Sequence, residues 1–290
     1  MKNKKSITPL VLFTVFTSII AASYGIFSND GAGQYVYESI RGEKITVYGI
    51  GLYKHMSADV AIQGIAQDYI TLFVGVPLLL ISLLFARKNS IRGMFLLSGI
   101  LGYFLVTYLF YLTMGMYNEL FLLYAFLLGV SFFSFVLVLL SYDIYKIKEI
   151  FTSGRLMKNA GIFLIVNASL VALLWLSIVV PPLIDGSIYP NGLQHYTTLI
   201  VQGLDLGLLL PAGALVGVLA IKKNIYGYLF APIYMIFLSL LMTALISKII
   251  FMAFAGENVV PVIFIMPTIA LISITFSILL LKKIRIADRY

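Results

Sequence analysis

The sequence predicts an all-α polytopic membrane protein, a transmembrane helical bundle of about eight spans. Of its 290 residues, 61% are hydrophobic and only 11% are charged. In soluble domains about 45–50% of the residues are apolar and about 25% are charged. The apolar residues lie in runs of about 20, the length of helix that crosses a bilayer core of ~30 Å. Because continuous apolar runs satisfy their backbone in lipid only as helices, strands are not expected to span the membrane.

The apolar runs define eight spans, separated by connections of different length. In chain order the spans are predicted at 7–27, 66–86, 93–113, 119–142, 161–183, 199–221, 226–253 and 262–281. The first run is expected to be an uncleaved span and not a signal peptide. The longest connection, about 28–65, is rich in Tyr and Gly and is expected to be extracytoplasmic, with a short extended or interfacial piece at 42–48.

The basic residues predict the orientation. Most of the 20 Lys and Arg residues belong to one set of span ends: Lys2, Lys4, Lys5, Arg87, Lys88, Arg92, Lys146, Lys148, Arg155, Lys158, Lys222, Lys223, Lys282, Lys283, Arg285 and Arg289. The other set has only Arg41, Lys44 and Lys54. The positive-inside rule therefore predicts a multi-pass protein of the cell membrane with both termini in the cytoplasm. The net charge of +8 indicates contact with an anionic lipid bilayer and not nucleic acid.

An internal repeat is indicated by two similar segments. Residues 57–93 align without gaps on 191–227, so that 57 corresponds to 191. The matching features are the helix N-caps Ser57 and Asn191, the prolines Pro77 and Pro211, the basic turn residues Lys88 and Lys222, and the glycines Gly93 and Gly227. We predict a 4+4 parallel tandem repeat, with four-helix units at 1–150 and 151–290 in the same orientation.

Proline and glycine in these spans predict local distortion and close packing. Pro77 and Pro211 fall within spans, where each removes a backbone donor and is expected to act as a kink or hinge, although membrane helices also tolerate proline generally. In the sixth span, small residues recur one turn apart, at Gly203 and Gly207 and again at Gly213 and Gly217. This spacing predicts close contact with a neighbouring helix.

Four ionisable residues lie where lipid penalises charge: Asp68, Glu119, Asp205 and Lys248. A rise of 1.5 Å per residue places all four in the outer half of the bilayer. Three carboxylates and one ammonium give a net charge of −2, which predicts a protonated carboxyl or a bound cation. Any of the three acids could meet Lys248 if their helices are neighbours, and the leading hypothesis pairs Lys248 with Glu119 to gate or neutralise the site.

Neutral polar residues accompany these charges. Thr71 lies one turn from Asp68, and Gln202 lies one turn from Asp205. The others are Tyr103, Thr107 and Tyr111, which form a stripe along the third span, and Asn118, which precedes Glu119. Together they predict a polar pocket between the two units that binds a proton, a cation or a small amine. The alternative is a structural polar network, or side chains that extend to the outer interface.

The leading functional hypothesis is a membrane protein that transports or binds a small polar or cationic solute. One alternative is a membrane-embedded enzyme that uses Asp68 and Asp205 as acid and base. Another is a non-catalytic sensor or assembly subunit with a structural polar network. The chain has no P-loop, G-x-S-x-G or H-E-x-x-H motif, no cysteine and two histidines, so no metal or cofactor is expected and an enzyme is disfavoured. Nothing in the sequence indicates an oligomeric state.

Parts of the chain resemble an uncharacterised family of prokaryotic eight-span membrane proteins. The resemblance covers about residues 60–250. The residues that carry it are Gln67-Asp68-Tyr69-Ile70-Thr71-Leu72, Pro77, Arg92-Gly93, Tyr117-Asn118, Phe121-Leu122-Leu123-Tyr124, Gln202-Gly203-Leu204-Asp205-Leu206-Gly207, Pro211 and Lys248. This family has no established activity, so the resemblance supports the polar residues as a set and implies no reaction.

Overall fold

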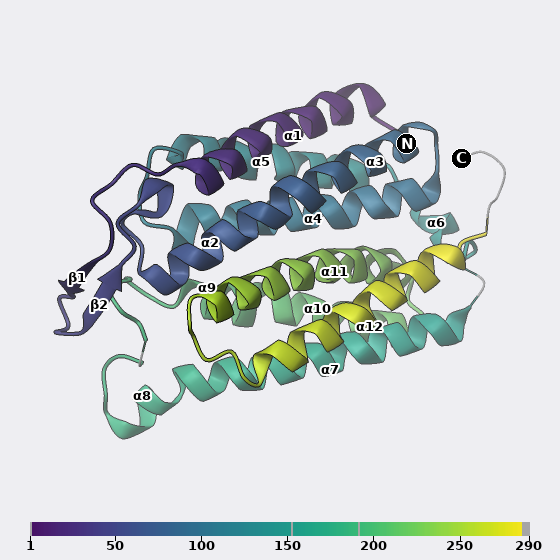
Figure 1. Ribbon diagram of the computed structural model, residues 1–290. Helices are drawn as coiled ribbons and strands as arrows, with labels where there is room; N and C mark the ends of the chain where they lie inside the picture. Colours follow the sequence, from purple (N-terminus) through teal and green to yellow (C-terminus); the bar gives the residue numbers. More distant parts are fainter. Residues whose placement is uncertain (1, 152, 191, 286–290) are drawn as a thin grey trace.

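The computed structural model describes residues 2–151, 153–190 and 192–285 (Figure 1). Eight helices in this part of the chain are long and apolar enough to cross a membrane, which confirms the predicted all-α polytopic bundle. They are α1 (Lys4–Phe27), α2 with η2 and α3 (Ala58–Ile70, Thr71–Gly75, Val76–Arg87), α4 (Ile91–Met114), α5 (Phe121–Leu139), α7 with α8 (Gly154–Val179, Pro181–Asp185), α9 with η3 and α10 (Ile200–Leu204, Asp205–Leu209, Leu210–Ile221), α11 (Ile225–Phe254) and α12 (Val262–Lys282).

Four short elements of the described residues lie outside the spans. The long first connection forms an antiparallel hairpin of β1 (Tyr35–Glu38) and β2 (Lys44–Val47), followed by a single 3-10 turn, η1 (Gly51–Tyr53). The helix α6 (Ile144–Ile147) follows α5. The extended piece predicted at 42–48 is therefore the second strand of this hairpin.

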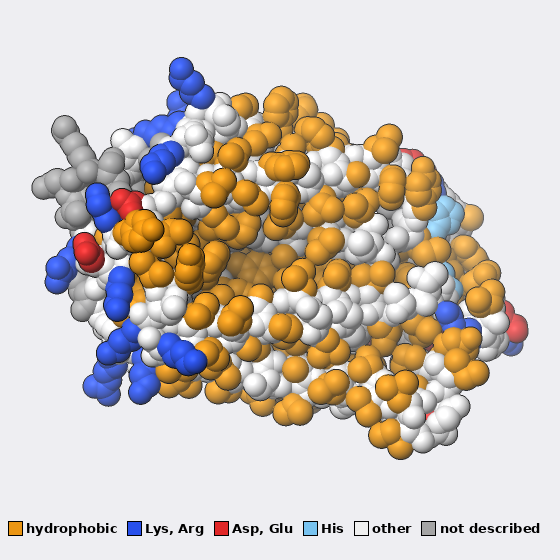
Figure 2. Space-filling model, turned by 180° about the vertical axis from the view of Figure 1, so that it is seen from behind, with side chains coloured by type: hydrophobic (Ala, Val, Ile, Leu, Met, Phe, Trp, Pro, Cys, Tyr) orange, Lys and Arg blue, Asp and Glu red, His pale blue; other side chains and the backbone are white. Residues whose placement is uncertain are grey.

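The two ends of the bundle differ in charge and structure. The β-hairpin lies at one end, and the N- and C-terminal helices begin and finish at the other (Figure 1). We call these the hairpin end and the basic end, because Lys and Arg side chains gather at the latter (Figure 2). Hydrophobic side chains cover the length between them (Figure 2). Arg289 lies outside the described residues, and the assignment of the basic end to the cytoplasm stays a prediction.

The predicted helix starts are correct in the second span and wrong in the sixth. Ser57 is the N-cap residue of α2, as expected, although its hydroxyl makes no capping hydrogen bond. The sixth span begins only at Ile200, with Leu199 as its N-cap residue, so a helix that opens at Asn191 is ruled out. Asn191 itself lies outside the described residues. The intervening connection forms turns instead, because the hairpin end holds it through hydrogen bonds described below.

A widened helical turn precedes both Pro77 and Pro211. The π-helical segments Thr71–Gly75 and Asp205–Leu209 precede Pro77 and Pro211. Within each, a backbone N–H donates to the carbonyl five residues earlier, from Val76 to Thr71 and from Leu210 to Asp205. The predicted distortions are therefore π turns inside continuous spans, a feature that is frequent at functional sites. Their role as hinges stays a prediction.

Two other local features occur at corresponding positions of the two aligned segments. Asn89 and Lys223 both have a positive φ, of 61° and 55°. The next residue in each case, Ser90 or Asn224, caps the following helix through its side chain. These turns end the second and sixth spans in the same way. The internal duplication itself stays a prediction.

The helices pack in two sets that meet at α11. In the first helix group, α1 contacts α2, α3 and α5, and α4 contacts α3 and α5. In the second helix group, α10 contacts α7 and α11, and α12 contacts α11. Between the groups, α11 packs against both α4 and α2. Residues on α11 therefore face both groups, which positions Lys248 at the boundary.

Glycine permits the closest contact between spans five and six. A Cβ at Gly217 would lie 2.6 Å from the carbonyl oxygen of Gly161, and the converse distance is also 2.6 Å. Gly213 similarly lies against the ring of Tyr234. The predicted close packing is therefore confirmed at Gly213 and Gly217. It is wrong at Gly203 and Gly207, where an added Cβ would meet nothing within 4 Å.

Gly217→Ala is expected to lower the free energy of unfolding by about 1–3 kcal/mol, the usual cost of overpacking. The added methyl group would push α7 away from α10, because besides the Ile165 side chain it meets backbone that cannot rotate away, the Gly161 carbonyl oxygen. Unfolding by SDS in mixed micelles measures the change. Gly207→Ala is the matched control, since a Cβ there meets open space. Equal losses in the two variants would contradict the proposed contact.

Candidate functional site

Asp68 lies in the core of the first helix group with both carboxylate oxygens bonded. The hydroxyl of Tyr53 donates to Oδ2 at 2.6 Å, and the hydroxyl of Tyr111 donates to Oδ1 at 2.9 Å. Asp68 is 2% exposed, and Gly25 on α1 leaves no room for a side chain between the two helices. The carboxylate is therefore enclosed by hydrogen-bond donors.

A second set of polar contacts continues from Asp68 along the same helix. Gln67 donates through Nε2 to the Tyr103 hydroxyl at 2.8 Å and to the Thr107 hydroxyl at 3.2 Å. The hydroxyls of Thr71 and Tyr103 are 2.9 Å apart. The structure thus brings the predicted stripe of Tyr103, Thr107 and Tyr111 against the predicted residues of the second span. All of these side chains are buried or partly buried.

Asp205 has a more open environment. It is the first residue of η3 and is half-buried. The indole N–H of Trp175 on α7 donates to its Oδ2 at 2.8 Å. Within the described ranges no second hydrogen-bond donor reaches this carboxylate, so Oδ1 retains capacity to accept one. Asp205 therefore differs from Asp68, whose two oxygens are both engaged.

Lys248 lies on α11 between these two carboxylates. The charges of Asp205 and Asp68 both act on its ammonium group. Among the described residues, neither carboxylate lies within the 4.0 Å of an ion pair with it. The adjacent Ser247 donates to the carbonyl of Ala66 on α2 at 3.2 Å, which ties α11 to the helix that carries Asp68. One ammonium is thus placed near two carboxylates from different helix groups.

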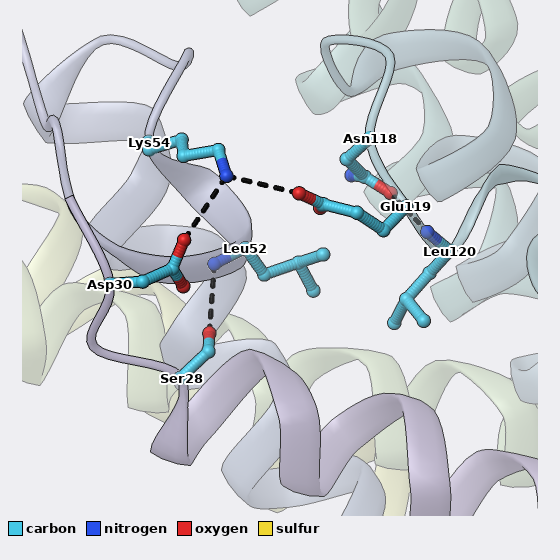
Figure 3. Close-up of polar contacts among 7 residues, drawn as sticks. All are labelled: Ser28, Asp30, Leu52, Lys54, Asn118, Glu119 and Leu120. Carbon is cyan, nitrogen blue, oxygen red and sulfur yellow. Dashed lines mark hydrogen bonds and ion pairs between the residues drawn. The ribbon is translucent and has the colours of Figure 1, made fainter.

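Glu119 lies outside the membrane-spanning helices, contrary to the prediction. It belongs to the connection between α4 and α5, its side chain is 51% exposed, and its Oε1 lies 3.0 Å from Nζ of Lys54 (Figure 3). Lys54 also contacts Asp30 at 3.2 Å. The expected pair of Glu119 with Lys248 is therefore wrong, because the long first connection supplies a nearer cation. Asn118 accepts from the backbone N–H of Leu120 at 3.0 Å and caps the local turn.

The pair of Lys54 and Glu119 is expected to contribute little to stability. A hydrogen bond from its own backbone N–H and then one from Lys54 lower the pKa of Glu119. The bond to Glu119 and then that to Asp30 raise the pKa of Lys54. Because the pKa of Glu119 is lowered, the stabilisation is present above the ordinary value of about 4.3 and is lost as the pH falls through the lower folded value.

Glu119→Gln is therefore expected to shift the unfolding temperature at neutral pH by no more than the scatter of repeat measurements, since exposed ion pairs are screened by water and salt. Differential scanning fluorimetry at low and high salt measures this. A large loss at neutral pH that persists in high salt would show that the residue has another role.

A pocket of about 460 Å³ lies at the hairpin end, next to Asp205. We call it the hairpin-end pocket. It lies between the end of α7, the connection 186–199 and α9, and its lining includes Thr197, Thr198, Gln202 and Leu206. Gln202, a predicted ligand residue, thus borders a cavity. Asp205 does not line the pocket itself, but it lies less than one turn further along the same helix than Gln202 and directly before Leu206, which does.

The first helix group holds the wall of this pocket in place. Arg41 donates to the Gln194 carbonyl at 3.0 Å, Glu43 accepts from the Gln194 backbone N–H at 3.1 Å, and Asp59 accepts from its side-chain amide at 3.2 Å. The hydroxyls of Tyr196 and Ser57 lie 3.1 Å apart. These bonds explain why the connection does not continue as helix before Ile200.

Sequence reasoning missed three contributors. Tyr53 comes from the long first connection, and no periodic signal relates it to Asp68. Gln67 is the direct neighbour of Asp68 in sequence, so its polarity within an apolar run was a usable signal. Trp175, the only tryptophan of the chain, is not among the predicted site residues, yet its N–H bonds Asp205.

Comparison with protein-family models, with curated proteins and with solved structures gives no match to this chain. The resemblance to a prokaryotic eight-span family accordingly stays a prediction. In the described ranges, no group of three or more His, Cys, Asp or Glu side chains is placed to hold a metal ion. The candidate site is therefore assigned from its geometry alone.

Proposed function

We propose that this integral membrane protein binds and transports a small cationic solute, with Asp205 as its binding carboxylate and Lys248 as the internal cation that the solute replaces. One observation carries the proposal. Lys248 lies within electrostatic reach of Asp68 and Asp205, yet forms a close ion pair with neither among the described residues. A purely structural charge in a membrane is expected to pair directly, since an unpaired one is costly.

Asp68 and Asp205 have different environments, which indicates which of the two carboxylates would bind the solute. Asp68 accepts from two tyrosine hydroxyls and needs no further donor. Asp205 accepts from Trp175 alone among the described residues, so it is the carboxylate that a cation or amine would bind. Binding there would cancel the charge that attracts Lys248, whose remaining anionic neighbour is Asp68. The solute and Lys248 would thus compete for one site.

The hairpin-end pocket offers a route to Asp205. Its Gln202, Thr197 and Thr198 side chains provide hydrogen-bonding groups for a partly dehydrated cation. We further propose that the basic end faces the cytoplasm, as the positive-inside rule predicts. The pocket would then open toward the outside of the cell.

The π turns offer a means of coupling solute binding to a change in helix conformation. They begin at Thr71 and at Asp205, and both residues belong to the polar contacts of the site. A change of hydrogen-bond register within either turn would rotate one of these side chains. We propose that Pro77 and Pro211 favour such changes, because neither residue has an N–H to stabilise a single register.

For the Asp68 network, one specific observation favours a structural role. Both of its oxygens are bonded, and its exposure is 2%. A substrate would have to break a tyrosine contact to reach it. The same geometry disfavours an enzyme with Asp68 and Asp205 as acid and base, since such a pair needs a common cavity. We therefore assign solute binding to Asp205 and support of the fold to Asp68.

Uptake of radiolabelled methylammonium into proteoliposomes tests this function. Under an inside-negative potassium diffusion potential, vesicles with the wild-type protein are expected to accumulate the probe above empty vesicles. Asp205→Asn is expected to reduce this uptake at least about tenfold, the effect of about 1.4 kcal/mol of binding energy. Asp185→Asn is the matched control, because Asp185 lies on an exposed turn of α8. No uptake by the wild type, or equal uptake by Asp205→Asn, would overturn the proposal.

A further inference from the structure

An apolar groove of about 680 Å³ lies between the two helix groups, on the side of the bundle away from the contact of α2 with α11. Residues of α4, α5, α10 and α11 line it, among them Leu105, Phe132, Ala212 and Phe237. Because these helices are transmembrane, the groove lies at the depth of the lipid hydrocarbon. Figure 2 shows a hollow between hydrophobic side chains on the face opposite that of Figure 1. Its volume is typical of small-molecule sites, which are mostly apolar.

Glycine leaves part of this groove unfilled. An added Cβ at Gly129 on α5 would meet nothing within 4 Å, and one at Gly102 on α4 would make only ordinary contacts, with the Phe237 side chain at 3.8 Å and the Phe135 side chain at 3.9 Å. Both glycines line the groove. Bundle interiors normally fill such space with side chains. This groove is instead wide enough to accept an apolar chain without any movement of its walls.

The groove reaches toward the proposed binding carboxylate. Leu208 and Leu209 line it and belong to the π turn that begins at Asp205. Tyr234 also lines it, and the charge of Asp205 acts on the Tyr234 hydroxyl. That hydroxyl is already engaged, because it donates to the Leu209 carbonyl at 2.7 Å. Asp205 is therefore a charged group near the groove that retains an accepting oxygen.

From this arrangement we infer that the solute is a single-chain amphiphile with a cationic head, such as a long-chain amine, whose head binds Asp205 and whose chain lies in the apolar groove. The inference rests on the proposed role of Asp205. Charge complementarity selects this occupant: apolar walls would accept any chain, whereas the carboxylate favours a cationic head over a neutral one. A transmembrane helix of a partner would bring about 10 Å of width and no charge to match Asp205.

Photolabelling in phosphatidylcholine nanodiscs tests the inference. The probe is dodecylamine with a diazirine at the end of its chain, and the control probe is dodecanol with the same group. Mass spectrometry is expected to find amine adducts on groove residues of α4, α5 and α10, at least about tenfold above the alcohol. Excess unlabelled dodecylamine should suppress these adducts, and excess dodecanol should not. Asp205→Asn should reduce the amine adducts to the level of the alcohol.

A pair of variants at one position tests whether the chain occupies the groove. Gly129→Leu places a branched side chain in the open space and is expected to lose the groove adducts. Gly129→Ala adds one methyl group, keeps most of the space and is expected to retain them. The unfolding temperatures of both variants show that the fold is preserved. Equal labelling of Gly129→Leu and Gly129→Ala would overturn the assignment of the chain to this groove.

The outcomes separate this inference from the proposed function. Equal groove labelling by the amine and the alcohol, together with methylammonium uptake that depends on Asp205, would overturn the amphiphile and leave the proposed function intact. Absence of both the amine preference and the uptake would overturn both. Labelling of the groove by the amine alone, with loss in Asp205→Asn and in Gly129→Leu, would establish the substrate class.

Discussion

Asp68→Ala is expected to destabilise the first helix group by about 1–3 kcal/mol, the cost of a buried donor left without an acceptor. The substitution removes the acceptor of the Tyr53 hydroxyl, whereas the Tyr111 hydroxyl, which also bonds Asp68, keeps the Gly64 carbonyl as an acceptor at 3.1 Å. It also removes one of the two carboxylates whose charges act on Lys248. Equilibrium unfolding by SDS in mixed micelles measures the loss, and hydrogen exchange is expected to place it at the hairpin end of α1 and α2.

Asp68→Asn is the matched control for this experiment. The amide has the shape of the carboxylate and keeps one carbonyl oxygen as acceptor, so we expect a loss well below that of the alanine variant. The variant also separates stability from transport, because the role assigned to Asp68 predicts methylammonium uptake that falls far less than in Asp205→Asn. A neutral effect of Asp68→Ala on unfolding would contradict the network as a stabilising element.

The second large effect is expected from Lys248→Met, which leaves Asp68 and Asp205 without the cation between them. Removing one partner of a buried charge arrangement typically costs about 3–5 kcal/mol. Combining Lys248→Met with Asp205→Asn should recover part of this loss, because the second change removes one of the uncompensated charges. The double-mutant cycle is expected to give a coupling of about 0.5–3 kcal/mol. SDS unfolding of the wild type, both single variants and the double variant measures it.

A parallel cycle with Asp68→Asn provides the comparison. Asp205 is the stronger influence on Lys248 of the two carboxylates, and Asp68 already has two tyrosine donors. The coupling of Lys248 with Asp205 is therefore expected to exceed that with Asp68. Additivity in both cycles would show that Lys248 interacts with neither carboxylate in the folded protein, and the exchange proposed for the solute would lose its basis.

The sequence predicts the local part of this site well. Residues one turn apart on a helix share a face whatever surrounds it, so helical spacing alone groups Asp68 with Thr71, and Tyr103 with Thr107 and Tyr111. The structure confirms that these two faces meet. The position of Glu119 within the bilayer was predicted wrongly. The helix of the fourth span, α5, begins only at Phe121, so Glu119 lies in the connection before it.

Contacts that join distant segments follow no such periodicity. The hydrogen bond that Tyr53 donates to Asp68 depends on how the long first connection folds over the ends of two helices. The bond from Trp175 to Asp205 depends on α7 lying against the sixth span, and that contact follows from the fit of Gly161 to Gly217. The sequence does not show that Gly161 and Gly217 pack against each other, since glycines at such positions are common in membrane helices.

The sequence by itself determined that this is an eight-span helical protein and that Asp68, Asp205 and Lys248 place charge in its membrane-spanning segments. It could do so because the thickness of the bilayer and the backbone hydrogen bonds of a helix act on each span separately. Only the tertiary structure decided which carboxylate is enclosed and which remains open, that Lys54 and not Lys248 meets Glu119, and that an apolar groove approaches Asp205. These depend on which helices are neighbours, and neighbours are selected by side-chain fit between spans that lie far apart in the chain.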